Sequence, residues 1–212
     1  CVENTGYQTP FSSIWLNRKN GSRTITHYRH LPELNTTNLK RIHLSDYDWI
    51  HFEGRNITTL IEYLQGYYID HGKPECVISL EIEKKRAHIE ALIPCIDFAI
   101  VSSYYLQSSE ISPEQCIQQF HTINPELKLA CTLGESGVIA GDHHENITRI
   151  SALNVNQVID TIGAGDCFIA GWIDALLKKE PFETSLHSAN RLAAYKIQQK
   201  GMNIEGYKNS SL

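Results

Sequence analysis

Two glycines and an aspartate stand directly before an apolar segment in the stretch IDTIGAGDCF, residues 159–168. The apolar run at residues 168–173 is typical of a buried helix, in which each glycine costs about 1 kcal/mol relative to alanine. Glycine lets a backbone approach a ligand closely, and the start of a helix presents unpaired N–H groups and a positive dipole end. Gly163, Ala164 and Gly165 are therefore predicted to form an anion site suited to a phosphate.

Asp166 would lie in the first turn of that helix, beside the phosphate. A carboxylate there repels a phosphate unless it serves the reaction, and its simplest role is that of a general base toward an attacking hydroxyl. Phosphoryl transfer depends mostly on positioning and charge neutralisation, so one base and an anion hole suffice. The alternative is structural: a first-turn aspartate stabilises a helix by about 0.3–1 kcal/mol, and the glycines would form only a tight turn.

The composition narrows the classes of protein to consider. A chain of 212 residues that is 42% hydrophobic suits one sizeable domain, with or without a small appendage. A net charge of -5 without long runs of like charge does not indicate a nucleic-acid partner. No stretch approaches 18 apolar residues, so no membrane span is predicted.

The cysteines and histidines show no pattern that predicts a metal site. The six cysteines form no CxxC, and most lie in apolar segments, which favours buried thiols in a reducing compartment and a cytoplasmic location. The adjacent histidines His143 and His144, beside Asp142, are more typical of a solvated turn than of a ligand set. No metal ligands are predicted among them.

Strand-like and helix-like patterns alternate over residues 48–200. The predicted strands are residues 49–52, 76–82, 98–101 and 127–132; the predicted helices are 57–70, 84–93, one from Pro113, 165–179 and 183–200, with a short hairpin around Gly141. Such alternation predicts parallel βαβ units in an α/β fold with a doubly wound, mostly parallel sheet.

A β-hairpin is predicted at residues 11–30, where two alternating runs flank a turn at residues 19–22 that contains Asn-Gly. A lone hairpin is not stable in water, so it must pack on a partner chain or a ligand cleft. The predicted organisation is a hairpin with its connection at residues 1–32, followed by an α/β domain at residues 33–212.

Residues 160–166, DTIGAGD, resemble the DTxGAGD signature of the ribokinase-like (PfkB) carbohydrate kinases. In that family the last aspartate is the base and the Gly-Ala-Gly amides hold the transferring phosphate. The resemblance therefore implies these roles for Asp166 and for Gly163, Ala164 and Gly165.

A second loop, TLGESG at residues 132–137, resembles the nucleotide-side TxGxxG loop of the same family, although taken alone it could be an ordinary β-turn. The resemblance implies ATP contacts from Thr132, Leu133, Gly134 and Glu135, and a loop shaped by Gly137.

Three further segments resemble the fructose-phosphorylating branch of that family: WIHFEGRN at 49–56, SLEIEK at 79–84, and the hairpin region at 9–25. This resemblance implies that Arg55 contacts ATP phosphates, which a guanidinium fork suits; an ion pair with Glu53 or Glu83 is the alternative. Glu81 and Glu83 either hold Mg²⁺ through water or form a solvated strand end.

The resemblance implies an ATP- and Mg²⁺-dependent kinase for a small-molecule sugar, with the 1-hydroxyl of fructose as the leading acceptor. The hairpin would be a lid over the sugar that clasps the lid of a second copy in a homodimer, and the alternative is that it packs on its own domain. Another sugar or a nucleoside as acceptor, or a non-catalytic nucleotide-binding protein, are the alternatives. Asn190 is a weaker candidate for the adenine side, or else a solvated polar residue of the last helix.

The sequence departs from the family pattern at two places. The family's Asn-x-x-Glu motif is absent where residues 101–105 read VSSYY. No counterpart of the family's sugar-binding aspartate and Gly-Gly-x-x-x-Asn region occurs in residues 1–10, and the first residue is Cys1. The chain is therefore expected to be a fragment, or a truncated product, that lacks most of the sugar site.

Overall fold

The computed structural model describes residues 6–16, 23–143, 146–202 and 204–207. The chain divides into two compact units, Cys1–His43 and Leu44–Leu212, which are described separately.

The first unit contains the predicted hairpin. Strands β1 (Phe11–Leu16) and β2 (Arg23–Tyr28) pair antiparallel. Both predicted strands are confirmed, and the predicted turn at residues 19–22 lies outside the described residues. The short helix α1 (Thr36–Leu39) follows, capped by the side chain of Asn35.

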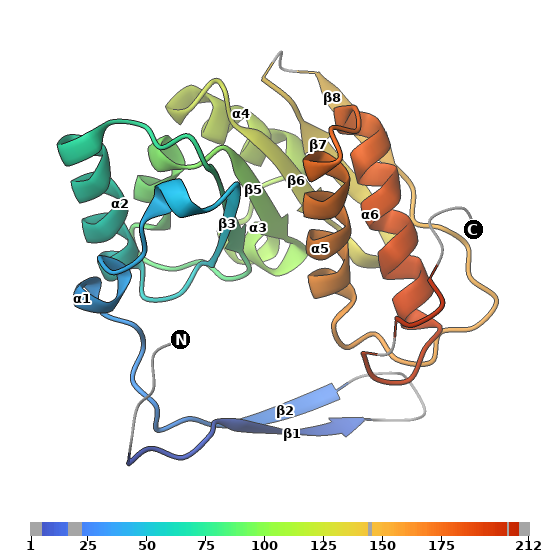
Figure 1. The fold of residues 1–212 in the computed structure, drawn as a ribbon. Coiled ribbons are helices and arrows are strands. Elements are labelled where there is room, and N and C mark those ends of the chain that lie inside the picture. The colour runs from blue at the N-terminus through green and yellow to red at the C-terminus, as the bar shows by residue number, and fades with distance from the viewer. Residues whose placement is uncertain (1–5, 17–22, 144–145, 203, 208–212) are drawn as a thin grey trace. The chain divides into compact units, whose positions relative to one another are not determined.

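The second unit is built on a six-stranded sheet of order β3-β4-β5-β6-β7-β8 (Figure 1). Its strands are β3 (Trp49–Glu53), β4 (Val77–Ile82), β5 (Phe98–Ser102), β6 (Lys128–Thr132), β7 (Val138–Gly141) and β8 (Ile147–Ile150). The first four are parallel to one another, and β7 and β8 continue the sheet as an antiparallel hairpin. The predicted mostly parallel α/β sheet is confirmed. Within the described strands the order follows the chain, so the reversal that defines a doubly wound sheet does not occur among them.

Helices and short 3₁₀ turns connect the strands. They are η1 (Leu44–Asp46), α2 (Ile57–His71), η2 (Ile89–Cys95), α3 (Ser103–Ser109), α4 (Pro113–Ile123), η3 (Gly134–Ser136), α5 (Ala164–Leu177) and α6 (Phe182–Ile197). Helices α5 and α6 lie side by side at the β7–β8 end of the sheet, and α2 lies at the other end (Figure 1).

The core between the sheet and α5 is centred on Trp172, which is 1% exposed. Its ring meets that of Phe98 edge-on at 5.5 Å between centroids, an arrangement that aromatic quadrupoles favour. Its indole N–H donates to Ser185 of α6 at 2.9 Å, so the buried polar atom has a partner. This packing fixes α5 against the sheet and therefore fixes where its first turn lies.

The predicted helix at residues 84–93 is wrong: the chain forms only the 3₁₀ turn η2 there. Pro94 lies inside this turn, lacks an N–H and disfavours helical dihedrals at Ile93. His88, which precedes the turn, has a positive φ of 64°, which also ends any helix from residue 84. Helix α3, which follows β5 directly, was not predicted.

The described cysteines are free and buried: Cys76, Cys95, Cys116, Cys131 and Cys167. The predicted burial of the cysteines is confirmed for these five, and Cys1 lies outside the described residues. None of the helices in the described ranges combines the length and the apolarity needed to cross a membrane.

Replacing Gly54 by alanine is expected to destabilise the second unit by about 1–3 kcal/mol. A Cβ at Gly54 would lie 2.6 Å from the carbonyl oxygen of Glu81 and 3.0 Å from Cδ1 of Ile89. The backbone N–H of Gly54 also donates to that carbonyl at 2.8 Å, so neither strand can move away without losing the bond. Chemical denaturation measures the change.

Gly66 provides the matched control, because it lies inside α2 and a Cβ there meets nothing within 4 Å. Gly66→Ala is expected to stabilise the protein by about 0.5–1 kcal/mol. Equal effects of the two substitutions would contradict the steric argument.

Candidate active site

The carboxyl ends of the parallel strands meet at one edge of the sheet. Glu53 at the end of β3 lies opposite Glu81 of β4, and Ser102 at the end of β5 lies opposite Thr132 of β6. Because alternate residues of a strand share a face, Glu53 and Glu81 lie on the same face as Trp49, which packs on the α5 core. The ends of these strands and the loops that follow them carry Arg55 and the predicted nucleotide-contacting residues 132–135 and 137.

The first turn of α5 forms as the glycines predict. Gly163 is the N-cap residue with a φ of +79°, which an L side chain rarely adopts, and a Cβ there would collide with Met202. The N–H of Ala164 donates to the carbonyl of Thr161 at 3.2 Å. Among the described residues, the N–H groups of Gly165 and Asp166 have no hydrogen-bond acceptor. Two donors and the dipole of a 14-residue helix are thus open to an anion.

Asp160, at the start of the DTIGAGD loop, fixes the path of the backbone into α5. Its carboxylate accepts from the N–H of Ile162 at 2.9 Å and from the N–H of Gly201 at 3.1 Å. These bonds, followed by a smaller contribution from Lys196, hold the pKa of Asp160 below its ordinary value. The sequence identified Asp160 only as part of a motif. Its hydrogen bonds to Ile162 and Gly201 became known only from the structure.

Asp166 belongs to a group of carboxylates at this edge. Burial raises the pKa of Glu81 to about 7, and the carboxylates of Asp166, Glu83 and Glu53 add to the rise, whereas Arg55 opposes it. The predicted base, from the first turn of α5, therefore lies within electrostatic reach of the ends of β3 and β4. The sequence did not identify this concentration of negative charge, since the carboxylates come from separate segments.

His51 and Ser79 add a hydrogen-bonded relay on the same face. Trp49 donates its indole N–H to Oγ of fully buried Ser79 at 2.8 Å, and this Oγ lies 2.8 Å from Nδ1 of His51. Burial lowers the pKa of His51, and the carboxylates of Glu53 and Asp166 oppose the shift. The sequence quoted Trp49 and His51 within a motif but gave no sign that Ser79 joins them.

Arg55 follows β3 at the site edge and forms an ion pair with Glu53. Its side chain is 45% exposed, so the guanidinium is open to a ligand as well as to this carboxylate. The ion pair considered from the sequence is therefore present, and the phosphate contact stays a prediction.

The TLGESG loop turns tightly after β6. The N–H of Leu133 donates to the carbonyl of Gly137 at 2.8 Å, and that of Gly137 donates to the carbonyl of Gly134 at 3.0 Å. Gly137 has a φ of +90°, and a Cβ there would lie 2.6 Å from the backbone nitrogen of Ala152 and 2.8 Å from the backbone carbon of Ser151. Thr132 precedes this turn and the exposed Glu135 lies within it. The close approach of Gly137 places the loop against the segment that follows β8.

Asn190 of α6 reaches the same segment, since its amide donates to the carbonyl of Ser151 at 2.8 Å. It is 9% exposed, so the prediction of a solvated polar residue is wrong. The burial reflects the close approach of α6 to the chain after β8.

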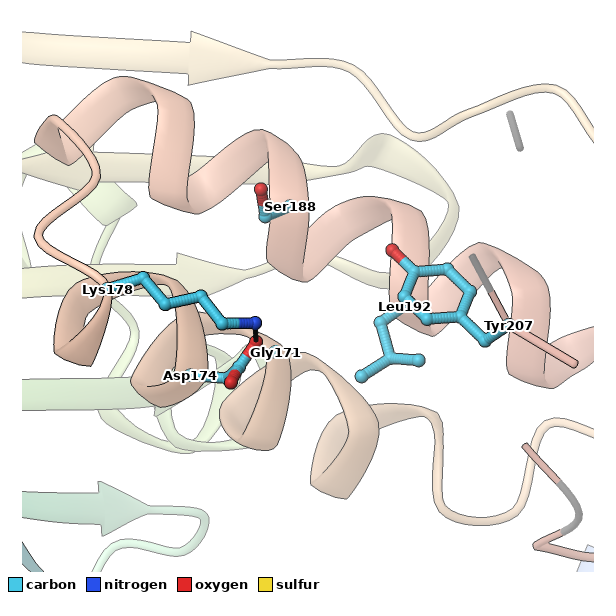
Figure 2. Close-up of a pocket in the computed structure, with 6 residues that line it drawn as sticks. All are labelled: Gly171, Asp174, Lys178, Ser188, Leu192 and Tyr207. Atoms are coloured by element: carbon cyan, nitrogen blue, oxygen red, sulfur yellow. Dashed lines mark hydrogen bonds and ion pairs between the residues drawn. The ribbon is translucent and has the colours of Figure 1, made fainter. Parts of the chain in front are cut away.

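A cavity of about 230 Å³ between α5 and α6 is distinct from these residues (Figure 2). Its lining residues are Gly171, Asp174, Lys178, Ser188, Leu192 and Tyr207. Asp174 pairs with Lys178 at 2.6 Å, and Ser188 donates to Glu180 at 2.8 Å. Its charged groups are therefore compensated within the fold, and none of the predicted site residues lines it.

No group of three or more His, Cys, Asp or Glu side chains in the described ranges is placed to hold a metal ion. The mutual influence of Glu81, Asp166 and Glu53 nevertheless shows excess negative charge at the edge. Such a set fits Mg²⁺ that arrives on nucleotide phosphates and keeps its waters, rather than an ion in a protein cage.

Solved structures of known proteins share the fold of this chain. The fold matches ribokinase of Arabidopsis thaliana, solved with ribose and ATP, at a TM-score of 0.70 and 19% identity over 92% of this chain and 65% of that one. A putative ribokinase II of E. coli matches at 0.75 and 18% identity over 92% and 67%. The chain thus has the ribokinase-like α/β fold and spans about two thirds of these proteins.

Similarity of sequence shows to which family the chain belongs. The profile described as pfkB family carbohydrate kinase matches residues 9–207, so the chain belongs to this family. Mouse (Mus musculus) ketohexokinase is 30% identical over 200 residues, which cover 91% of this chain and 67% of the mouse protein. The family predicted from the motifs is confirmed, whereas its fructose-phosphorylating branch stays a prediction.

Glu81→Gln is expected to raise the melting temperature at pH 8 and to have little effect at pH 5. A folded-state pKa of about 7, above the ordinary value, means that the proton on Glu81 stabilises the folded state at low pH. This stability is lost as the pH rises from the ordinary pKa of 4.5 to about 7, and it is absent at pH 8, whereas glutamine has no charge to bury. The expected gain at pH 8 is about 1 kcal/mol after allowance for solvent screening.

Thermal unfolding followed by circular dichroism at both pH values measures the difference. Glu126→Gln, at an exposed position, controls for charge removal in general. A gain of equal size at pH 5 and pH 8 would show that Glu81 is not held in this way.

Proposed function

We propose that this protein transfers the γ-phosphoryl group of ATP to a sugar hydroxyl, with Asp166 as the general base. The observation that carries the proposal is the first turn of α5, where Asp166 stands in the same turn as N–H donors that no described residue uses. N–H groups that can stabilise the charge of a phosphoryl group and a carboxylate that can accept a proton therefore lie in one helical turn. In-line phosphoryl transfer to a hydroxyl requires both.

In the proposed reaction, the acceptor hydroxyl lies beside Asp166, which takes its proton as the oxygen attacks the γ-phosphorus. The bond to the β–γ bridging oxygen breaks, and ADP leaves with that oxygen. The N–H groups of Gly163, Ala164 and Gly165 stabilise the charge on the transferring group, and Ala164 would exchange its bond to Thr161 to do so. Membership in the pfkB family supports this assignment.

ATP would be held from two loops at the sheet edge. The guanidinium of Arg55 would bind the phosphates as well as Glu53. The second loop, whose shape depends on Gly137, would contact the nucleotide through Thr132, Leu133, Gly134 and Glu135. Mg²⁺ bound with ATP would neutralise charge on the phosphates, and Glu81 and Asp166 would supply the negative charge that attracts it.

Fructose, phosphorylated at its 1-hydroxyl, is the leading acceptor. The WIHFEGRN and SLEIEK segments and the similarity to mouse ketohexokinase support it. Another sugar or a nucleoside is the alternative acceptor, and the ribokinase structures favour a test with ribose.

We also propose that the hairpin is a lid that joins two copies of the protein. Phe11 and Trp15, 60% and 71% exposed, lie on one face of the hairpin, and Ile14 and Ile25 lie on the other. A two-stranded hairpin with apolar side chains on both faces needs a partner for each. A sugar under one face and the lid of a second copy on the other would supply them.

Asp166→Asn is expected to lower kcat by about 10²–10⁴-fold and to leave the ATP dissociation constant within a few fold, because asparagine cannot accept the proton. Coupled detection of ADP and calorimetric ATP titration measure the two quantities. Asp174→Asn, eight residues further along α5 in an exposed ion pair with Lys178, is the matched control and should keep wild-type turnover. Turnover of Asp166→Asn near the wild-type value would exclude Asp166 as the base.

An acceptor panel at fixed MgATP is expected to give the highest kcat/KM with fructose, followed by ribose and adenosine. Mass spectrometry of the product identifies the phosphorylated hydroxyl. A preference for adenosine or ribose would replace fructose without changing the proposed chemistry. ATP binding without transfer to any of them would favour a non-catalytic nucleotide-binding protein.

A further inference from the structure

Lys196 of α6 is a fully buried cation whose charge no step of the proposed reaction uses: it is 0% exposed. Its Nζ donates to the carbonyl oxygen of Asp160 at 2.8 Å and lies 3.3 Å from Oδ2 of the same residue. Both oxygens belong to the residue that begins the DTIGAGD loop. A buried ammonium is costly unless compensated, so this placement requires an explanation.

The surrounding contacts bind this loop to the end of α6. The N–H groups of Ile159 and Asp160 both donate to the carbonyl of Ile197, at 2.7 and 3.1 Å. The N–H of Gly201, beyond the helix, donates to the carboxylate of Asp160. Lys196 is therefore part of a joint that connects α6 to the start of α5.

The charge of Lys196 extends to the first turn of α5. Burial raises the pKa of Cys167 in that turn and the carboxylate of Asp166 adds to the rise, while Lys196 opposes it. The predicted phosphate loop lies between the carboxylates of Asp160 and Asp166. The negative charges of two carboxylates disfavour the binding of a phosphate between them. A cation beside one of these carboxylates compensates half of that charge.

We propose that Lys196 is a positioning residue that neutralises Asp160, so that the loop can use an aspartate to fix its backbone and still bind a phosphate. The inference rests on the proposed function, since it concerns how ATP is held. The carboxylate supplies the geometry through Ile162 and Gly201, and the ammonium removes its electrostatic penalty.

Three variants test the proposal by calorimetric titration with MgATP. Lys196→Gln retains a donor for the Asp160 carbonyl but leaves the carboxylate uncompensated, and it is expected to weaken ATP binding by about tenfold. The double variant Asp160→Asn/Lys196→Gln removes both charges and is expected to recover most of the affinity, while its melting temperature stays below that of the wild type. Lys178→Gln, which removes a surface lysine from a similar pair, should leave the affinity unchanged.

If Lys196 had only a structural role, the double variant would lose the contacts of both residues. It would then bind ATP no more tightly than Lys196→Gln. That result, or unchanged affinity in Lys196→Gln, would overturn the inference. If Lys196→Gln does not fold, the double variant alone decides: the inference expects it to bind ATP within a few fold of the wild type, and much weaker binding would overturn it. Failure of the wild type to bind ATP would instead overturn the proposed function, and the inference with it.

Discussion

The packing of Trp172 between the sheet and α6 is the constraint on which the candidate site depends. The ring is held by Phe98 on the sheet side, and its N–H is held by Ser185 of α6. With the helix fixed at its centre, its first turn can lie only at the edge where the parallel strands end. The glycines of the DTIGAGD loop are costly for helix stability, and this aromatic contact supplies the rigidity that they cannot.

The balance of charge at that edge explains why so many polar contacts gather there. Backbone N–H groups and a helix dipole contribute only partial charges, whereas each of the three carboxylates Glu53, Glu81 and Asp166 can contribute a whole one. The fold offsets this excess locally, through Arg55 beside Glu53 and through Lys196 beside Asp160. A site of this kind favours a polyanion that brings its own counterion over a bare one, which is consistent with a magnesium–nucleotide complex as the ligand.

The sequence predicted the elements that depend on local patterns. It did not predict the groups of side chains that form where distant segments of the chain meet. The strands, the last two helices, the hairpin strands and the DTIGAGD turn follow from apolar periodicity and glycine placement, and the family follows from motifs in the right order. The helix at residues 84–93 failed because Pro94 and the positive φ of His88 outweigh its apolar spacing. Lys196 gave only a faint signal, a lysine four residues after buried Leu192 on the inner face of α6. The carboxylate group around Glu81 gave none, because it exists only once the strands have paired.

The order of the strands also bears on how this part of the chain acquires its structure. Each strand from β4 to β8 pairs with the one that precedes it in the sequence, and no described strand of this sheet inserts between two others. The entropy of loop closure is therefore lost in small steps, each spanning one connection. Folding rates rise as contacts become more local, so each of these strands can join its neighbour soon after it has been synthesised. Helices α5 and α6, which complete the candidate site, follow β8 in the sequence, so synthesis of the chain would bring the DTIGAGD loop to strands that can already have paired.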